Sequence, residues 1–403
     1  MLKIIIAFWF NKTKCNNIKK NIINQINKML KIIIITFFFV IASCNELSFE
    51  KIKNIVKNLN TKYFDPINNL WNCKNFGCDW WQSAWTLYIM NDFIHISYLL
   101  KKNDSYTNEL VNITKFIYNS FSVEHECDSC NGDIQNVSFF IQCNGYYDDE
   151  AWWALAWMRA YQVSQYTKSI PEYLDLSKKI TLHLKQGWNN DCNGGIPWRH
   201  CGKDKMTIQN SIYLNVLNGL YKLTNNSEYY LDMKKSLKWL MNSNIVRNNY
   251  IYDGLNESCI NNCVPGYTYN QGLLLPILKN MNYDTLALGI AHNVLGFDEN
   301  KNYVWHNRIL REYDCVINGS CNDDQKMFKG IFMSFLKDYN LMEKSKRITD
   351  FINNNSISII SILNDKNNMS LIWTSNVTGY DNPVDFRTEI SATSCLISSL
   401  WNN

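Results

Sequence analysis

The stretch WWQSAWTLYIMNDFIHI, residues 80–96, is apolar around nearly the whole circumference of a helix. Residues 151–160 and 208–220 share this property. A helix that is apolar on every side is buried on every side. Between such segments lie amphipathic, lysine-rich ones such as residues 229–240, whose pattern indicates a helix with one face in solvent. Buried and surface helices therefore alternate along the chain.

Six pairs of a buried and a surface helix predict an all-α fold, an (α/α)6 barrel of six helical hairpins, in which the buried helices form an inner ring. The expected helices lie at residues 47–59, 81–101, 106–120, 149–166, 171–187, 207–223, 227–243, 269–281, 284–295, 325–340, 343–353 and 387–401. Since no linker divides them, residues 45–403 are expected to form a single domain. A two-domain helical bundle is the alternative. The piece 249–254 is a candidate local hairpin.

Residues 1–44 have the composition of a leader with a signal peptide. They carry seven Lys and no acidic residue, and the apolar run 32–42 ends in the small residues Ala42 and Ser43 before the chain turns polar. A basic start, a short apolar run and small residues at a cleavage site are typical of exported proteins. The run is short for a membrane span. Met29 is the expected start of translation, and an uncleaved signal anchor is the alternative.

The positive charge of the chain belongs to this leader. The formal net charge is +4, and removing the seven leader lysines leaves −3 for the remainder. A slightly acidic body lacks the basic surface that phosphate groups require, so nucleic acid is not an expected partner. No apolar tail follows Trp401, so a lipid anchor signal is not expected. We expect a monomer without stable membrane insertion, either secreted or held in an endomembrane lumen.

Cysteines and glycosylation sequons agree with export. After the leader, cysteines lie close together at Cys73/Cys78, Cys127/Cys130/Cys143, Cys192/Cys201, Cys259/Cys263 and Cys315/Cys321, with Cys395 apart. Such cysteines form disulfides in an oxidising compartment, although the sequence does not determine their pairing. A metal site at residues 125–130, which combine one His with a CxxC, is the alternative. Sequons occur at Asn103, Asn112, Asn136, Asn225, Asn256, Asn318, Asn354, Asn368 and Asn376.

The segment with the highest density of reactive groups is NGYYDDEAWWALAW, residues 144–157. Its three acids, Asp148, Asp149 and Glu150, open a helix whose body is built of Trp, Ala and Leu. Acids in a first helical turn meet the positive end of the helix dipole and cap free N–H groups. Acids at the start of a buried helix also face the protein interior, where ionising a carboxyl costs free energy. Proteins keep such carboxyls mainly where catalysis needs their perturbed pKa. From the residues alone, capping and catalysis are equally supported.

A carboxyl pair at a helix start suits glycoside hydrolysis. The first residue is not yet helical there, so both side chains can converge, and a separation of about 5 Å is typical of a retaining glycosidase. One carboxylate attacks the anomeric carbon, and the other protonates the leaving oxygen and later activates water. Tryptophans stack on the apolar faces of sugars and raise the pKa of a nearby carboxyl by desolvation.

The same segment resembles the signature of glycoside hydrolase family 76, the endo-α-1,6-mannanases. Further resemblances follow in order along residues 80–400: WWQSA at 80–84, GGIPW at 194–198, Asn210 with residues 217–221, TYNQG at 268–272 and FKGI at 328–331. The resemblance implies an (α/α)6 barrel, which agrees with the hairpin count. It also implies action with retention on α-1,6-linked mannan or manno-oligosaccharides, and neither a metal nor an organic cofactor.

The resemblance assigns roles to individual residues. Asp148 takes the role of nucleophile and Asp149 that of general acid/base. The substrate-binding residues that it implies are Tyr147, Trp81, Gly194, Gly195, Trp198, Asn270 and Gln271. The cysteine-bearing stretches 122–143, 255–265 and 314–322 depart from the family pattern and could reshape the groove. The resemblance therefore supports the type of reaction more directly than the identity of the substrate.

Several of these residues also have a plain structural interpretation. Trp81 and Trp85 share a helix face, a spacing more typical of a core than of a groove. Gly194-Gly195 would let backbone approach a sugar beside Trp198, or it is simply a turn. Asn270 and Gln271 would otherwise cap the helix that follows.

Two further groups of residues are given no catalytic role. The pair Asp323-Asp324 stands at another helix start and is interpreted as capping. The six His form neither an i, i+4 pair nor an HExxH motif, so no metal-dependent hydrolase is expected.

The sequence therefore predicts a secreted hydrolase of internal α-1,6-mannosidic bonds. A transglycosidase of the same fold, in which a sugar hydroxyl replaces water, uses the same carboxylates and stays open as an alternative. A carbohydrate-binding protein on this scaffold is the alternative from another class.

Overall fold

The computed structural model describes residues 47–402 apart from short gaps. The gaps are residues 75–77, 122–123, 129–133, 139, 142–144, 265, 298–301, 313–314, 317–319, 364–366 and 376. Between 122 and 137 only the backbone of two strands is described. The leader with Met29 and the side chains of the candidate metal site at 125–130 thus lie outside the described residues. Residues 50–403 form one compact unit.

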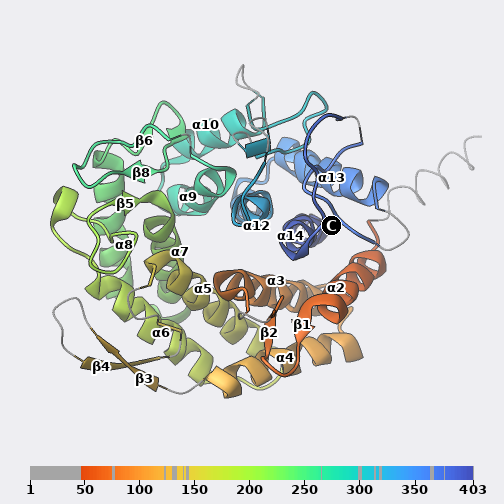
Figure 1. Cartoon of the computed structure of the whole chain (residues 1–403), viewed down its shortest axis with the longest axis horizontal. Helices are drawn as coiled ribbons and strands as arrows, with labels where there is room; N and C mark the ends of the chain where they lie inside the picture. Colours follow the sequence, from red (N-terminus) through yellow and green to blue (C-terminus); the bar gives the residue numbers. More distant parts are fainter. Residues whose placement is uncertain are drawn as a thin grey trace, which may run out of the picture. The chain divides into compact units, whose positions relative to one another are not determined.

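Helices dominate the described chain and form two concentric layers (Figure 1). The inner layer consists of α3 (Trp80–Leu99), α5 (Tyr147–Ser164), α7 (Thr207–Thr224), α9 (Thr268–Asn280), α12 (Gln325–Glu343) and α14 (Phe386–Leu400). The outer layer consists of α2 (Phe49–Tyr63), α4 (Ser105–Phe121), α6 (Pro171–Gln186), α8 (Ser227–Asn242), α10 (Asp284–Val294) and α13 (Lys346–Ser361). Each inner helix packs against the next one along the chain, and α14 packs against α3, which closes the ring. The predicted (α/α)6 barrel is confirmed.

Burial explains why the two layers differ in composition. The inner helix α5 is buried from Glu150 to Met158 without interruption, and Trp153 and Trp157 are fully inaccessible. The outer helix α8 buries only Met233, Ser236, Leu237, Trp239 and Leu240. An inner helix needs apolar residues on all sides, whereas an outer helix needs a single apolar stripe.

The sequence locates every one of these helices but misplaces some ends. The largest differences are in α13, which continues to Ser361 beyond the expected end at 353, and in α2, which ends at Tyr63 instead of 59. None of the helices in the described part is long and apolar enough to cross a membrane.

Short hairpins connect the helices at the ends of the barrel. Strands β1 (Phe64–Asp65) and β2 (Leu70–Trp71) pair, as do β3 (Glu124–Asp128) with β4 (Ile134–Ser138) and β5 (Lys205–Met206) with β8 (Gly254–Leu255). Strands β6 (Val246–Arg247) and β7 (Tyr250–Ile251) form the tight hairpin expected near residue 249. Its turn residues Asn248 and Asn249 have φ of 54° and 56°, which agrees with a type I′ turn.

The C-terminal halves of three inner helices share a buried charge cluster. Lys337 of α12 lies 2.9 Å from Asp92 of α3, and both side chains are 1% exposed. Arg159 of α5 approaches the other oxygen of Asp92 at 3.5 Å. Burial disfavours the charged carboxylate, but the charges of Lys337 and Arg159 outweigh it and lower the pKa of Asp92. Opposite charges from neighbouring helices thus neutralise one another inside the barrel.

We expect Lys337→Met to destabilise the protein by about 3–5 kcal/mol, because it leaves the buried carboxylate of Asp92 without its closest partner. Urea unfolding followed by circular dichroism measures this loss. Lys346→Met is the matched control, since Lys346 pairs with Asp350 on the surface with 85% of its side chain exposed, and it should change stability little. Equal losses in both variants would contradict the structural role of the buried cluster.

Candidate active site

A cavity of about 490 Å³ opens at the end of the barrel where the inner helices begin. It is lined by Trp81, Tyr146, Asp148, Asp149, Trp152, Trp198, Met206, Ile208, Asp253, Tyr267, Tyr269, Asn322, Asp324, Gln325 and Phe328. The first two turns of α3, α5, α7, α9 and α12 all contribute to this lining. The positive ends of five helix dipoles therefore point toward the cavity, an arrangement that favours negative charge there.

Four carboxyl groups line the cavity, and no Lys, Arg or His is among the described lining residues. Asp148 and Asp149 come from the first turn of α5, Asp253 from the loop before β8, and Asp324 from the start of α12. Burial, the largest cause in each case, raises the pKa of all four. Crowded, desolvated carboxyls of this kind are typical of acid–base sites.

The carboxylate of Asp148 is held by one specific donor. Nε1 of Trp198 donates a hydrogen bond of 3.1 Å to its Oδ2, while Oδ1 is buried and has no hydrogen-bond partner among the described residues. Burial raises the pKa of Asp148 to about 7, with the hydrogen bond from Trp198 acting in the opposite direction. A buried oxygen without a partner costs about 1–3 kcal/mol, and such a cost is typical of a functional site.

Asp149 differs from its neighbour in having no described hydrogen-bond donor. Burial and the like charges of Asp148 and Asp324 raise its pKa well above the usual range. Trp198 favours the ionised form of Asp148, and no such donor lowers the pKa of Asp149.

Asp324 is a site residue that the sequence interpretation missed. It was expected to cap α12, but its side chain makes no capping hydrogen bond. Asn322 caps the helix instead, accepting from the backbone N–H of Gln325 at 2.9 Å. Oδ1 of Asp324 accepts hydrogen bonds from Trp81 Nε1 at 3.0 Å and Gln82 Nε2 at 3.1 Å, so it is bound to the first turn of α3 beside the cavity.

Asp253 is the second missed residue. It is 7% exposed and accepts a hydrogen bond of 3.0 Å from Nδ2 of Asn270. Burial raises its pKa to about 6, with hydrogen bonds from Asn270 and Asn262 acting against the rise. No motif in the sequence marks Asp253, because a single Asp in a loop carries no pattern.

Aromatic rings form two walls of the cavity. The indoles of Trp81 and Trp152 are stacked with centroids 5.9 Å apart, and the rings of Tyr269 and Phe328 with centroids 3.8 Å apart. Trp85, on the same face of α3 as Trp81, is fully buried instead. Flat apolar surfaces beside carboxylates are the features expected of a sugar-binding cleft.

The structure brings Trp81, Asp148, Asp149 and Trp198 together, but the other predicted substrate-binding residues are not among those lining the cavity. Tyr147 points to His200, with ring centroids 4.2 Å apart, and its neighbour Tyr146 lines the cavity in its place. Asn270 supports the wall through Asp253. Gln271 is fully buried and binds the backbone of Ile251 through both of its amide atoms.

The two glycines serve the packing of the loop that carries Trp198. Gly194 and Gly195 have φ of 132° and 85°, which favours glycine. A Cβ on Gly195 would lie 2.5 Å from the indole of Trp239, which crosses the loop. A disulfide between Cys192 and Cys259 joins this loop to the one after β8.

The structure supplies the disulfide pairing that the sequence left open. Two pairs of cysteines close in the sequence, Cys73–Cys78 and Cys315–Cys321, are bonded. Cys192 instead joins Cys259 across 67 residues, and Cys263 is free and exposed. Cys201 is disulfide-bonded as well.

One group of described residues has the composition of a metal site, and it lies outside the cavity. Glu150, His183 and His200 place their ligand atoms within 4.8 Å of one another. No sequence pattern indicates this group, because the two histidines come from different elements and share no helical spacing.

A helical double barrel with adjacent carboxyls and aromatic walls in one cavity has the features of a carbohydrate-active enzyme. A sequence model of glycosyl hydrolase family 76 matches residues 49–403, and the chain belongs to this family. The resemblance found in the sequence is thereby confirmed.

Known proteins similar to this chain agree with the family. The Saccharomyces cerevisiae mannan endo-1,6-alpha-mannosidase DCW1 is 27% identical over 271 residues, which span 64% of this chain and 57% of the yeast protein. An inactive α-1,6-mannanase variant from Salegentibacter sp. HEL1_6, in complex with α-1,6-mannotriose, superposes with a TM-score of 0.68 at 17% identity, covering 88% of this chain and 99% of that one. Dfg5 from Chaetomium thermophilum gives a TM-score of 0.63 at 16% identity, with 88% and 90% covered.

We expect Asp324→Asn to stabilise the protein slightly at neutral pH, because the raised pKa of Asp324 means that its charged form is disfavoured in the folded state. Asparagine keeps the oxygen that accepts from Trp81 and Gln82. Thermal unfolding at pH 7 measures the change.

Asp323→Asn is the control for this prediction. Asp323 is paired with Lys326 at 2.8 Å, and this hydrogen bond lowers its pKa, so its replacement should leave the melting temperature unchanged or lower it. Destabilisation by Asp324→Asn, or equal shifts from both variants, would contradict the assignment of Asp324 to a desolvated, like-charged site.

Proposed function

We propose that this chain hydrolyses internal α-1,6-mannosidic bonds of mannan with retention of configuration, through Asp148 and Asp149. The observation that carries the proposal is the asymmetry of the pair. Trp198 donates to Asp148 alone, so two adjacent, half-buried carboxyls differ in how readily they ionise. A retaining glycosidase needs this difference, since one carboxyl must be ionised and the other protonated.

Asp148 is the nucleophile in this mechanism. Trp198 fixes Oδ2 and leaves Oδ1 without a described partner, so one oxygen is oriented while the other is free to attack the anomeric carbon. The bond to the leaving oxygen breaks as the bond to Oδ1 forms, which gives a covalent mannosyl-enzyme. Five helix N-termini around the cavity stabilise the ionised form of Asp148.

Asp149 is the general acid and then the general base. Burial and the charges of Asp148 and Asp324 keep its proton in place until the leaving oxygen accepts it. The resulting carboxylate then takes a proton from a water molecule that attacks the covalent intermediate, and the product retains its configuration.

The mannan substrate is supported by the cavity and by the relatives. Stacked aromatic pairs on two walls suit the apolar faces of hexose rings. The relatives include a mannan endo-1,6-alpha-mannosidase and an α-1,6-mannanase variant in complex with α-1,6-mannotriose. The disulfides support action in an oxidising compartment, outside the cell or in an endomembrane lumen.

We expect the full chain to release short manno-oligosaccharides from unbranched α-1,6-mannan. Asp148→Asn should abolish turnover, and Asp149→Asn should lower it by about 10²–10⁴-fold, the usual contribution of a general acid–base group. Product chromatography measures both. Asp323→Asn is the matched control, because this neighbouring acid does not line the cavity, and it should keep full activity.

Azide rescue separates the two roles. With Asp149→Ala, azide should attack the covalent intermediate and give the α-mannosyl azide, whereas with Asp148→Ala it should replace the nucleophile and give the β-mannosyl azide. The opposite pattern would reverse the assignment. Products longer than an added oligosaccharide would identify a transglycosidase, and binding without turnover by the wild-type chain would identify a carbohydrate-binding protein.

A further inference from the structure

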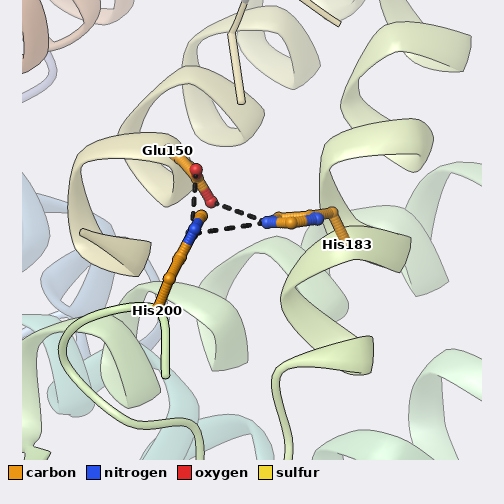
Figure 2. A group of neighbouring side chains, drawn as sticks. All are labelled: Glu150, His183 and His200. Carbon is orange, nitrogen blue, oxygen red and sulfur yellow. Dashed lines mark hydrogen bonds and ion pairs between the residues drawn. The ribbon is translucent and has the colours of Figure 1, made fainter. Parts of the chain in front are cut away.

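A second cluster of titratable side chains adjoins the first turn of α5 without lining the cavity (Figure 2). Glu150 follows the catalytic pair, His183 stands in the last turn of α6, and His200 lies in the loop after Trp198. Nε2 of His200 is 3.1 Å from Oε1 of Glu150, and Nε2 of His183 is 3.2 Å from Oε2. The two imidazole Nε2 atoms are 3.4 Å apart. One nitrogen from each ring and the carboxylate thus converge on one point.

These separations have the size of the edges of a metal coordination tetrahedron. Bonds of about 2.0–2.1 Å from Zn²⁺ to nitrogen and oxygen, at tetrahedral angles, put ligand atoms about 3.3 Å apart. The 3.4 Å between the two Nε2 atoms matches this value. The carboxylate faces the two rings with different oxygens, Oε1 at 3.1 Å from His200 and Oε2 at 3.2 Å from His183, and one ligand atom from each residue lies within 4.8 Å of the others. Without an ion, one of the two Nε2 atoms donates and the other accepts across this contact, whereas a bound cation would accept the lone pairs of both.

The ligand positions are fixed by the backbone and by packing. His200 donates its backbone N–H to Gly145 at 3.1 Å, and Tyr147 donates its own to Trp198 at 3.0 Å, so the loop is paired with the residues that open α5. The ring of Tyr147 packs against both imidazoles, with centroids 4.2 and 5.6 Å away. Glu150 is fully buried. Ligands held on ordered backbone in a water-poor setting are the requirement for a preorganised metal site.

We propose that Glu150, His183 and His200 bind one Zn²⁺ ion that positions the loop carrying Trp198. Two imidazoles and a carboxylate are a ligand set that suits zinc, whereas Ca²⁺ and Mg²⁺ prefer oxygen ligands throughout. Water completes the fourth position. The ion ties the start of α5, the end of α6 and the Trp198 loop into one unit, and Trp198 is the residue that orients Asp148. The ion is thus a positioning element outside the cavity.

The test uses the untagged full chain, stripped with dipicolinate and then titrated with ZnCl₂ against a chromophoric zinc indicator. We expect one tight equivalent in the wild-type chain. His183→Gln and His200→Gln should each weaken it at least about 100-fold. Zinc should raise the melting temperature of the wild-type chain and of neither variant, because only an ion that binds the folded state stabilises it.

His306→Gln is the matched control, since His306 is exposed and lies apart from the cluster, and it should bind zinc like the wild-type chain. Co²⁺ substitution keeps the test decisive if a variant does not fold. The wild-type chain should show the absorption of tetrahedral Co²⁺ without a thiolate charge-transfer band, which excludes the exposed thiol of Cys263. Absence of a tight equivalent in the wild-type chain, a thiolate band, or unchanged affinity in both variants would overturn the proposal and leave an ion-pair cluster without metal.

Discussion

The common direction of the inner helices is the constraint on which the site depends. In a ring of hairpins every inner helix runs the same way, so the helix N-termini meet at one end of the barrel and the C-termini at the other. The positive helix ends surround the four carboxyls of the cavity. The buried cations Arg159 and Lys337 lie in the C-terminal halves of their helices, where the dipoles favour positive charge. The polarity of the barrel thus distributes charge along its axis.

The first turn of α5 shows how closely this charge is organised. Three consecutive acids meet three different environments: Asp148 receives an indole donor, Asp149 faces like charges, and Glu150 is held between two imidazoles. Burial tends to raise the pKa of Glu150, but its hydrogen bonds to His183 and His200 outweigh this and lower it. Neighbouring acidic residues therefore differ in the direction of their pKa shifts because of residues far away in the sequence.

Much of the fold was predictable, because a helix that is buried on all sides has apolar residues on all sides. The inner helices follow from their apolar circumference. The acids that open α5 stand out in the sequence, but from the residues alone capping and catalysis were equally supported. The catalytic roles and most of the binding residues rested on family resemblance.

The parts that the sequence did not reveal depend on long-range contacts. Asp324 looked like a cap because acids at helix starts usually are, and only the contacts with Trp81 and Gln82 show otherwise. Likewise, sequence spacing cannot show that Cys192 bonds to Cys259 rather than to Cys201, or that His183 faces His200.

Closure of the ring by its last helix has a consequence for biosynthesis. Trp85 of α3 donates a hydrogen bond to Ser394 of α14, 309 residues later, and Lys62 pairs with Glu389 across 327 residues. Among the helices of the barrel α14 is synthesised last, so one apolar side of α3 stays uncovered until α14 has been made. The barrel cannot close before α14 has been made, so the seam between α3 and α14 stays open while the residues between them are synthesised.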